Sequence, residues 1–170
     1  MKWRGARRAT IGLLDIFGFE DMPSNGLEQL LINLTNERIQ YIFNAVMFER
    51  ELEAYQKEGI TTTFERPSNL PCIDLFMSTA KPTGLIRLLA DQCKTVTTDG
   101  EKGEEKKEKA FVSALNKEFR DHSYFTRVDA PMMGRILRAK RDKWRERAPK
   151  NLGYEHCFQV HHYADTVTYS

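Results

Sequence analysis

Residues 27–58 form the longest stretch without proline or glycine, and this stretch most constrains how the chain can fold. At 1.5 Å per residue, a helix of about 30 residues would be roughly 45 Å long. Asn25 and Glu28 are close to the capping-box pattern that begins a helix. Such a helix either carries displacement between distant places or serves as a scaffold, and periodicity alone allows both. Apolar residues recur in it at helical spacing: Leu27, Leu30, Leu31, Leu34, Ile42, Phe43, Val46 and Met47.

An apolar run at residues 11–17 precedes this helix and leads into a hexapeptide, Asp15-Ile16-Phe17-Gly18-Phe19-Glu20. Such a run is typical of a buried parallel strand, so the hexapeptide lies where a strand passes to a helix. Asp15 can hold an ion or its waters, the Gly18 N–H is unhindered, and Glu20 can form an ion pair. These groups suit the binding of a terminal phosphate and magnesium. The alternative is a plain strand whose Asp15 caps a turn.

Together, these residues resemble the motor domain of the myosins. Residues 15–20 resemble the switch II loop of that family, residues 25–37 the start of its relay helix, and residues 55–60 the end of that helix. The resemblance covers residues 11–169, and we expect residues 1–10 to be an N-terminal extension outside it. Residues 117–128 resemble class VI. Further similar stretches follow in the family's order, at residues 71–75, 81–84, 89–93 and 162–169.

The resemblance implies an α/β fold: a fragment of a myosin-type P-loop NTPase motor domain, mostly helical, with a few strands of the central sheet. The phosphate-binding loop G-x-x-x-x-G-K-[ST] does not occur in these residues. We therefore expect an internal piece of a longer motor. Its expected parts are switch II (15–20), the relay helix (about 25–58), an actin-facing helix-loop-helix (about 72–119), a basic surface loop (about 130–150) and a returning strand (about 157–169).

For the intact motor, the resemblance implies ATP and Mg²⁺ as cofactors. The Gly18 N–H would reach the γ-phosphate, and Asp15 would hold magnesium through a water. Glu20 would pair with an arginine of the switch I loop and help to position the attacking water, so Gly18 and Glu20 are the expected catalytic residues. The isolated chain is expected to be inactive, because it lacks the phosphate-binding loop. The expected nucleotide-binding residues are Asp15, Ile16, Phe17, Gly18, Phe19 and Glu20.

The resemblance also implies the actin filament as partner, and a cytoplasmic, cytoskeletal location. Light chains or calmodulin would bind a lever arm that these residues do not contain. The contact is expected at an exposed turn between two short amphipathic helices, although the same residues suit a plain turn. A non-enzymatic actin-binding fragment is the alternative function. The residues expected to contact actin are Lys81, Pro82, Thr83, Gly84, Leu85 and Ile86.

Charge is distributed unevenly along the chain. Residues 132–150 carry eight Lys or Arg against two acids, whereas the remaining residues carry 18 basic against 22 acidic groups. The basic stretch is either a solvated face or a surface that steers an acidic partner such as actin. Nucleic acid is a less favoured partner, because no nucleic-acid-binding motif accompanies the stretch. Residues 99–109 are charge-balanced and without apolar side chains, which predicts a solvated, mobile loop.

The cysteines and histidines do not predict a disulfide framework or a metal site. Three cysteines, Cys72, Cys93 and Cys157, lack metal-ligand spacing and fit reduced thiols in a cytosolic protein. His161 and His162 would point to opposite faces of a strand at residues 158–163, which disfavours joint chelation of one ion. No stretch approaches the roughly 18 apolar residues that a membrane helix needs.

Overall fold

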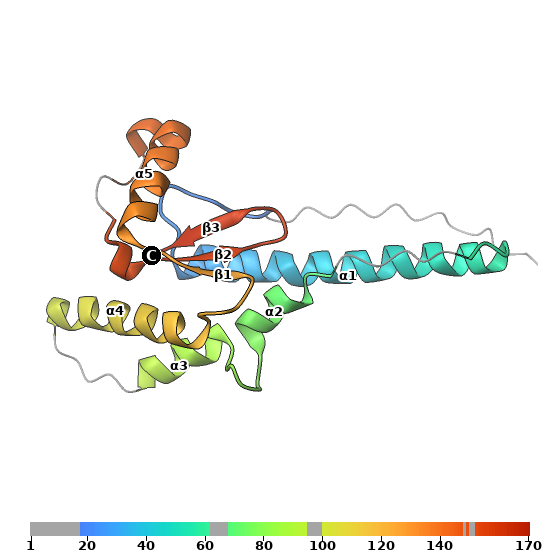
Figure 1. The fold of residues 1–170 in the computed structure, drawn as a ribbon, viewed down its shortest axis with the longest axis horizontal. Coiled ribbons are helices and arrows are strands. Elements are labelled where there is room, and N and C mark those ends of the chain that lie inside the picture. The colour runs from blue at the N-terminus through green and yellow to red at the C-terminus, as the bar shows by residue number, and fades with distance from the viewer. Residues whose placement is uncertain (1–17, 62–67, 95–99, 148, 150–151) are drawn as a thin grey trace, which may run out of the picture.

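The computed structural model describes residues 18–61, 68–94, 100–147, 149 and 152–170. This part of the chain is mostly helical and contains a small sheet (Figure 1). Its elements are, in chain order, α1 (Leu27–Lys57), α2 (Leu70–Met77), α3 (Leu85–Lys94), α4 (Gly100–Glu118), β1 (Phe125–Arg127), α5 (Ala130–Trp144), the 3₁₀ helices η1 (Arg145–Arg147) and η2 (Tyr154–His156), β2 (Phe158–His161) and β3 (Thr166–Tyr169).

The sheet is antiparallel with strand order β1-β2-β3. Phe158 of β2 lies opposite Tyr169 of β3, and His161 lies opposite Thr166. The single strand predicted at residues 157–169 is therefore wrong in detail, since these residues form a hairpin. The chain reverses because the His162 N–H donates to the Asp165 carbonyl (2.9 Å), and the Asp165 carboxylate accepts from the Thr166 N–H (2.7 Å). β1, which no sequence pattern predicted, adds the third strand.

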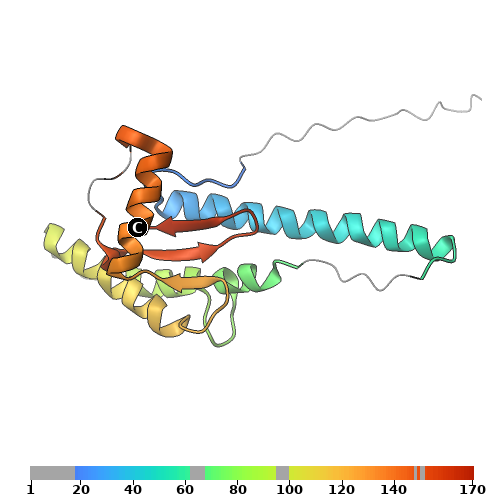
Figure 2. The same cartoon turned by 45° about the horizontal axis from the view of Figure 1, so that its top comes forward.

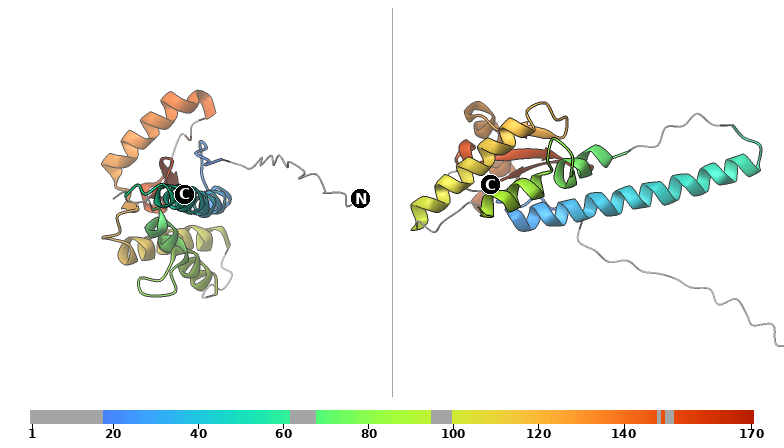
Figure 3. Two further views of the ribbon diagram at one scale, coloured as in Figure 1. Left: turned by 90° about the vertical axis from the view of Figure 1, so that its right-hand side faces the viewer. Right: turned by 90° about the horizontal axis from the view of Figure 1, so that it is seen from below.

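The main core lies between the sheet and helices α1 to α4. Aromatic rings stack across the sheet, with centroids 5.9 Å apart for Phe125 and Phe158 and 5.6 Å apart for Phe158 and Tyr169. A smaller buried cluster consists of Val128, Cys157 and Met133 of α5. Seen along α1, α5 lies on one side of that helix and α2 to α4 on the other (Figure 3). The fold class expected from the sequence is confirmed: a mostly helical chain with a few strands.

Helix α1 begins and ends within two residues of the helix predicted from the sequence. Its N-terminal half lies beside the sheet, and its C-terminal half extends away from the other described elements (Figures 1 and 2). The apolar positions that define the helical pattern are largely exposed, including Ile42 (55%) and Phe43 (57%). The buried residues of α1 are instead mostly polar: Leu30, Asn33, Asn36, Glu37 and Asn44.

Two segments predicted as loops are helical. Residues 100–109 form the first half of α4 and not a mobile loop. Lys109 pairs with Glu105 at 3.0 Å, one turn earlier, and with Glu155 of η2 at 3.0 Å. Such i,i+4 pairs stabilise a helix that carries few apolar side chains.

The basic stretch expected as a surface loop at residues 130–150 is mainly helix α5. Its start is defined by Asp129, whose carboxylate accepts from the Met132 N–H (2.8 Å), and by Pro131 in the first turn. Its end is marked by Arg145, which has a positive φ of 50°. In the part of the chain that the structure describes, no helix is long and apolar enough to span a membrane.

Candidate functional site

Gly18, Phe19 and Glu20 are the described part of the predicted phosphate-sensing loop; Asp15, Ile16 and Phe17 lie outside the described residues. Two asparagines of α1 hold the backbone of this loop. The Glu20 N–H donates to Asn33 Oδ1 (2.7 Å), and Asn33 Nδ2 donates to the Glu20 carbonyl (2.8 Å). Asn36 Nδ2 donates to the Gly18 carbonyl (3.1 Å). The loop and α1 are thus joined by three hydrogen bonds from side chains that lie one helical turn apart.

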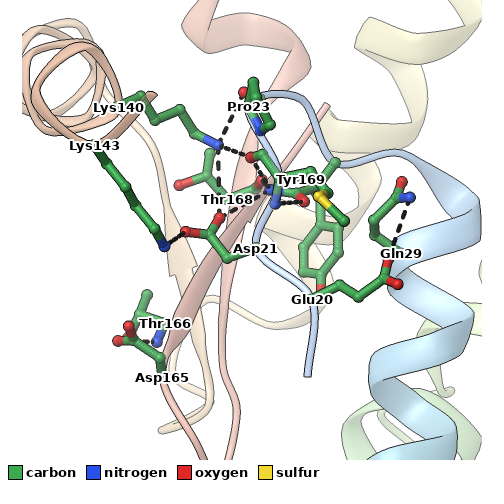
Figure 4. Close-up of polar contacts among 12 residues, drawn as sticks. Glu20, Asp21, Pro23, Gln29, Lys140, Lys143, Asp165, Thr166, Thr168 and Tyr169 are labelled. Atoms are coloured by element: carbon green, nitrogen blue, oxygen red, sulfur yellow. Dashed lines mark hydrogen bonds and ion pairs between the residues drawn. The ribbon is translucent and has the colours of Figure 1, made fainter. Parts of the chain in front are cut away.

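The two predicted catalytic residues lie where a ligand can reach them. Gly18 is exposed, and a Cβ added there would meet no atom within 4 Å. The half-buried Glu20 carboxylate has Gln29 Nε2 at 3.5 Å (Figure 4). A carboxylate can accept about four hydrogen bonds, so Glu20 keeps acceptor capacity for a cationic partner.

A buried hydrogen-bond network continues from Asn33 towards the turn of the hairpin. Asn33 Nδ2 lies 2.7 Å from the Tyr169 hydroxyl, which lies 2.7 Å from His162 Nε2. His162 Nδ1 lies 3.1 Å from Glu37 Oε1. Because Asn33 Nδ2 can only donate, we assign the Tyr169 O–H as donor to His162 Nε2, and His162 Nδ1–H as donor to Glu37.

Glu37 is fully buried in α1 and has further donors. The Tyr163 N–H donates to its Oε1 (2.7 Å), and Asn69 Nδ2 donates to both its carboxylate and its backbone carbonyl. Burial acts to raise the pKa of Glu37, but hydrogen bonds from His162, Tyr163 and Asn69 more than offset burial and hold the pKa below its usual value. Glu37 is therefore a charged acceptor that joins α1 to α2 and to the hairpin.

The rings of Phe19 and Phe76 each lie 5.8 Å from the His162 ring, measured between centroids. Phe19 belongs to the predicted phosphate-sensing loop, and Phe76 belongs to α2. The predicted binding residue Phe19 thus packs on the buried network.

Glu37, Cys72 and His162 place potential metal-ligand atoms within 4.8 Å of one another. Glutamate, cysteine and histidine are ligand types that bind zinc. In this cluster, however, both His162 nitrogens and both Glu37 oxygens already have hydrogen-bond partners. Burial, reinforced by the charge of Glu37, raises the pKa of Cys72 and keeps it a thiol. We therefore interpret the cluster as part of the network and assign it no ion.

Residues 21–23, which follow the loop, are held by two lysines of α5. Lys140 Nζ donates to the carbonyls of Met22 (2.8 Å) and Pro23 (3.1 Å), and Lys143 Nζ donates to Asp21 Oδ2 (2.8 Å) (Figure 4). Burial acts to raise the pKa of Asp21, but the hydrogen bond from Lys143 and the charge of Lys140 lower it overall. On the other side, Asn25 Nδ2 donates to the Thr168 carbonyl of β3 (3.0 Å).

The turn predicted to contact actin connects α2 to α3. Lys81 and Pro82 are exposed, and Thr83 is half-buried, with its N–H donating to Glu118 Oε1 (3.3 Å). Gly84 is buried, and a Cβ added there would lie 2.5 Å from the Phe76 carbonyl oxygen, so only glycine fits. Gly84 and Leu85 are buried and Ile86 is partly buried against the main core, so these three predicted contact residues are less accessible than Lys81 and Pro82.

Sequence reasoning missed the residues that hold the loop. Asn33, Asn36 and Glu37 share one face of α1 with Gln40 and Asn44, so a polar stripe at helical spacing was available as a signal. The ion pair between Asp21 and Lys143 joins residues that are 122 positions apart, and no local sequence pattern predicts it.

The family model described as "Myosin head (motor domain)" matches residues 2–170, which takes in most of the ten residues expected to lie outside the family. Mouse Myosin-14 is 38% identical over 162 residues, covering 94% of this chain and 7% of that protein. Mouse Myosin-IIIb is 36% identical over 164 residues, covering 95% of this chain and 10% of that protein.

A higher identity is found over a shorter stretch. The Myosin-M heavy chain of Dictyostelium discoideum is 51% identical over 84 residues, covering 49% of this chain and 5% of that protein. The chain therefore spans a tenth or less of the length of these relatives.

Proposed function

The chain belongs to the myosin head (motor domain) family, and from that premise we propose that it forms part of an actin-based motor in which ATP hydrolysis drives movement along actin filaments. The observation that carries the proposal is the attachment of the Gly18–Phe19–Glu20 backbone to α1 through Asn33 and Asn36. A loop that senses nucleotide is useful to a motor only if its position is transmitted. Here the receiving element is the longest helix among the residues that the structure describes.

The nucleotide part of this proposal rests on residues 15–20. Magnesium ATP supplies a phosphate that accepts hydrogen bonds and a cation that prefers oxygen ligands. We assign the Gly18 N–H to the γ-phosphate, Asp15 to magnesium through a water, and Glu20 to an arginine of the wider motor. The open space at Gly18 and the acceptor capacity of Glu20 support these roles. Hydrolysis also needs a phosphate-binding loop, so this chain alone is expected to be inactive.

Transmission follows from the hydrogen bonds of the loop. If Gly18 and Glu20 shift, Asn33 and Asn36 must shift with them or lose three hydrogen bonds. A helix of 31 residues is about 46 Å long, so a tilt of about 5° would displace its far end by roughly 4 Å. The exposed apolar residues of the C-terminal half of α1 would then move against whatever packs on them in the whole motor.

The partner part of the proposal rests on the turn between α2 and α3. Lys81, Pro82 and Thr83 remain accessible there and can contact actin, in a cytoplasmic, cytoskeletal location. A class VI assignment remains a proposal that rests on the sequence resemblance alone. The alternative function, a non-enzymatic actin-binding fragment, uses the same turn.

Actin cosedimentation of the 170-residue chain tests the partner. We expect pelleting with filaments that weakens as salt rises, and no effect of ATP on the isolated chain. Lys81→Glu should weaken binding at least fivefold, whereas Lys94→Glu, a change at an exposed lysine of α3, should change it less than twofold. No pelleting at low salt, or equal losses in the two variants, would overturn the assignment of the turn.

The full transcript around this reading frame tests the ATPase. An upstream G-x-x-x-x-G-K-[ST] loop in the same frame supports a working motor. A transcript that encodes only these 170 residues contradicts the ATPase part and leaves the non-enzymatic alternative.

A further inference from the structure

A basic groove lies between α4, the edge strand β1 and η2, away from the phosphate-sensing loop. Its cavity has a volume of about 890 Å³. Its charged lining comprises four cations and one carboxylate: Lys109 and Lys117 of α4, Arg120 just after α4, Arg127 of β1 and Glu155 of η2. We call this cavity the α4 groove.

The groove exists because α4 has two different faces. Val112, Leu115 and Phe119 recur at helical spacing and are buried in the main core. Lys109, Ser113, Asn116 and Lys117 recur at the same spacing on another face, and that face lines the groove together with Arg120, which follows the helix.

Most of the positive charge in the α4 groove is not neutralised from within. Lys109 is paired with Glu105 and Glu155 at 3.0 Å each. Lys117, Arg120 and Arg127 form no salt bridge with any residue whose side chain the structure describes. The groove therefore attracts an anionic ligand.

The arrangement of the cations suits an extended ligand. Lys109 and Lys117 are eight residues apart on α4, a distance of about 12 Å along the helix axis, and Arg120 lies just beyond the end of that helix. An extended peptide covers about 12 Å with about four residues.

The groove also borders a strand edge. β1 is one of the two edge strands of the described sheet. The His161 N–H donates to the Tyr124 carbonyl (2.9 Å). In this register, the backbone groups that form hydrogen bonds with β2 are therefore those of Tyr124 and Thr126. By the alternation of antiparallel pairing, the backbone of Arg127 faces away from β2. An extended peptide can form hydrogen bonds with such an edge.

We propose that the α4 groove binds an extended acidic peptide segment of a partner protein. Its carboxylates pair with Lys117, Arg120 and Arg127. This proposal is independent of ATP hydrolysis and of the turn at residues 81–83, so either proposal can fail without the other.

Fluorescence anisotropy with the 170-residue chain tests it. The probe is a labelled peptide of sequence Glu-Val-Glu-Val-Glu-Val, and the matched peptide replaces each Glu with Gln. We expect saturable binding of the acidic peptide that weakens with salt, and at least tenfold weaker binding of the Gln peptide. Arg120→Glu and Lys117→Glu should each weaken binding at least fivefold. Arg138→Glu, at an exposed arginine of α5, should change it less than twofold.

Three results would overturn the proposal. Equal losses for Arg120→Glu and Arg138→Glu would show attraction by overall charge. Binding of inositol hexakisphosphate at this groove without binding of the acidic peptide would show a compact-anion site. Tighter binding of a single-stranded oligonucleotide, lost in Arg120→Glu, would show a nucleic-acid site. Circular dichroism melting of each variant confirms that the fold is kept, since the substituted side chains are exposed.

Discussion

Glu37 is a fully buried carboxylate in the middle of a helix, a position where an unpaired charge is costly. Its two oxygens accept from His162 and Tyr163 in the hairpin turn and from Asn69 at the start of α2, which are two separate parts of the fold. Because its pKa lies below the usual value of 4.5, the stability that these bonds contribute is present above pH 4.5 and is lost as the pH falls through the folded pKa.

Glu37→Gln should lower the free energy of unfolding by about 2–4 kcal/mol. The glutamine keeps the volume, but its NH₂ group places a donor where the network supplies only donors. Urea denaturation at pH 7 measures the loss. Glu53→Gln, an exposed position of the same helix, should stay within about 0.5 kcal/mol. Equal stability of the two variants would contradict the role of Glu37.

The basic side chains of α5 lie on two different faces of the helix. Lys140 is buried and Lys143 half-exposed, and both hold residues 21–23 after the phosphate-sensing loop. Arg135, Arg138 and Arg141 are exposed. The basic stretch that the sequence presented as one surface therefore divides into lysines that position the chain and arginines that face solvent.

Lys140→Met should loosen residues 21–26 without unfolding α5. Methionine keeps the apolar stem of the lysine but cannot donate to the Met22 and Pro23 carbonyls. Hydrogen–deuterium exchange should show at least fivefold faster exchange of the amides at Glu20 and Met22, with α2 unchanged. Arg141→Met serves as the exposed control on the same helix. If both variants exchange alike, α5 does not position this segment.

The core contains buried cysteine thiols and a buried tyrosine hydroxyl that stay protonated at neutral pH. Burial raises the pKa of Cys157 to about 11, although the charge of Lys140 acts to lower it. Burial also raises the pKa values of Cys72 and Tyr169. These groups ionise in the unfolded chain at a lower pH than in the folded one.

The free energy of unfolding should therefore fall as the pH rises above about 9, because the unfolded state then releases protons that the folded state keeps. Cys157 alone accounts for about 2 kcal/mol by pH 11. Urea denaturation at pH 8, 9.5 and 10.5 under reducing conditions measures the fall. Cys157→Ala should be less stable at pH 8 but lose less on raising the pH, and Cys93→Ala, at an exposed thiol, should lose as much as the parent chain. An unchanged pH slope in Cys157→Ala would be the contrary result.

At each scale, the success of sequence reasoning depended on how local the interaction was. The bounds of α1 followed from a long run free of helix breakers, since each helical hydrogen bond spans only four residues. Composition misjudged residues 100–109, because a run of charges indicates solvation without distinguishing a loop from a helix held by i,i+4 pairs. The hairpin at residues 158–169 was read as one strand, because its turn depends on a hydrogen bond from His162 to Asp165.

By itself, the sequence determined the family and the mostly helical fold, and it predicted residues 15–20 as a candidate phosphate-sensing loop. Only the tertiary structure decided what holds that loop. The partners of Glu37 and Asp21 lie 125 and 122 residues away in the sequence, in His162 and Lys143. A buried polar group must find a hydrogen-bond partner wherever the folded chain brings one, and that choice is made by packing and not by neighbouring residues.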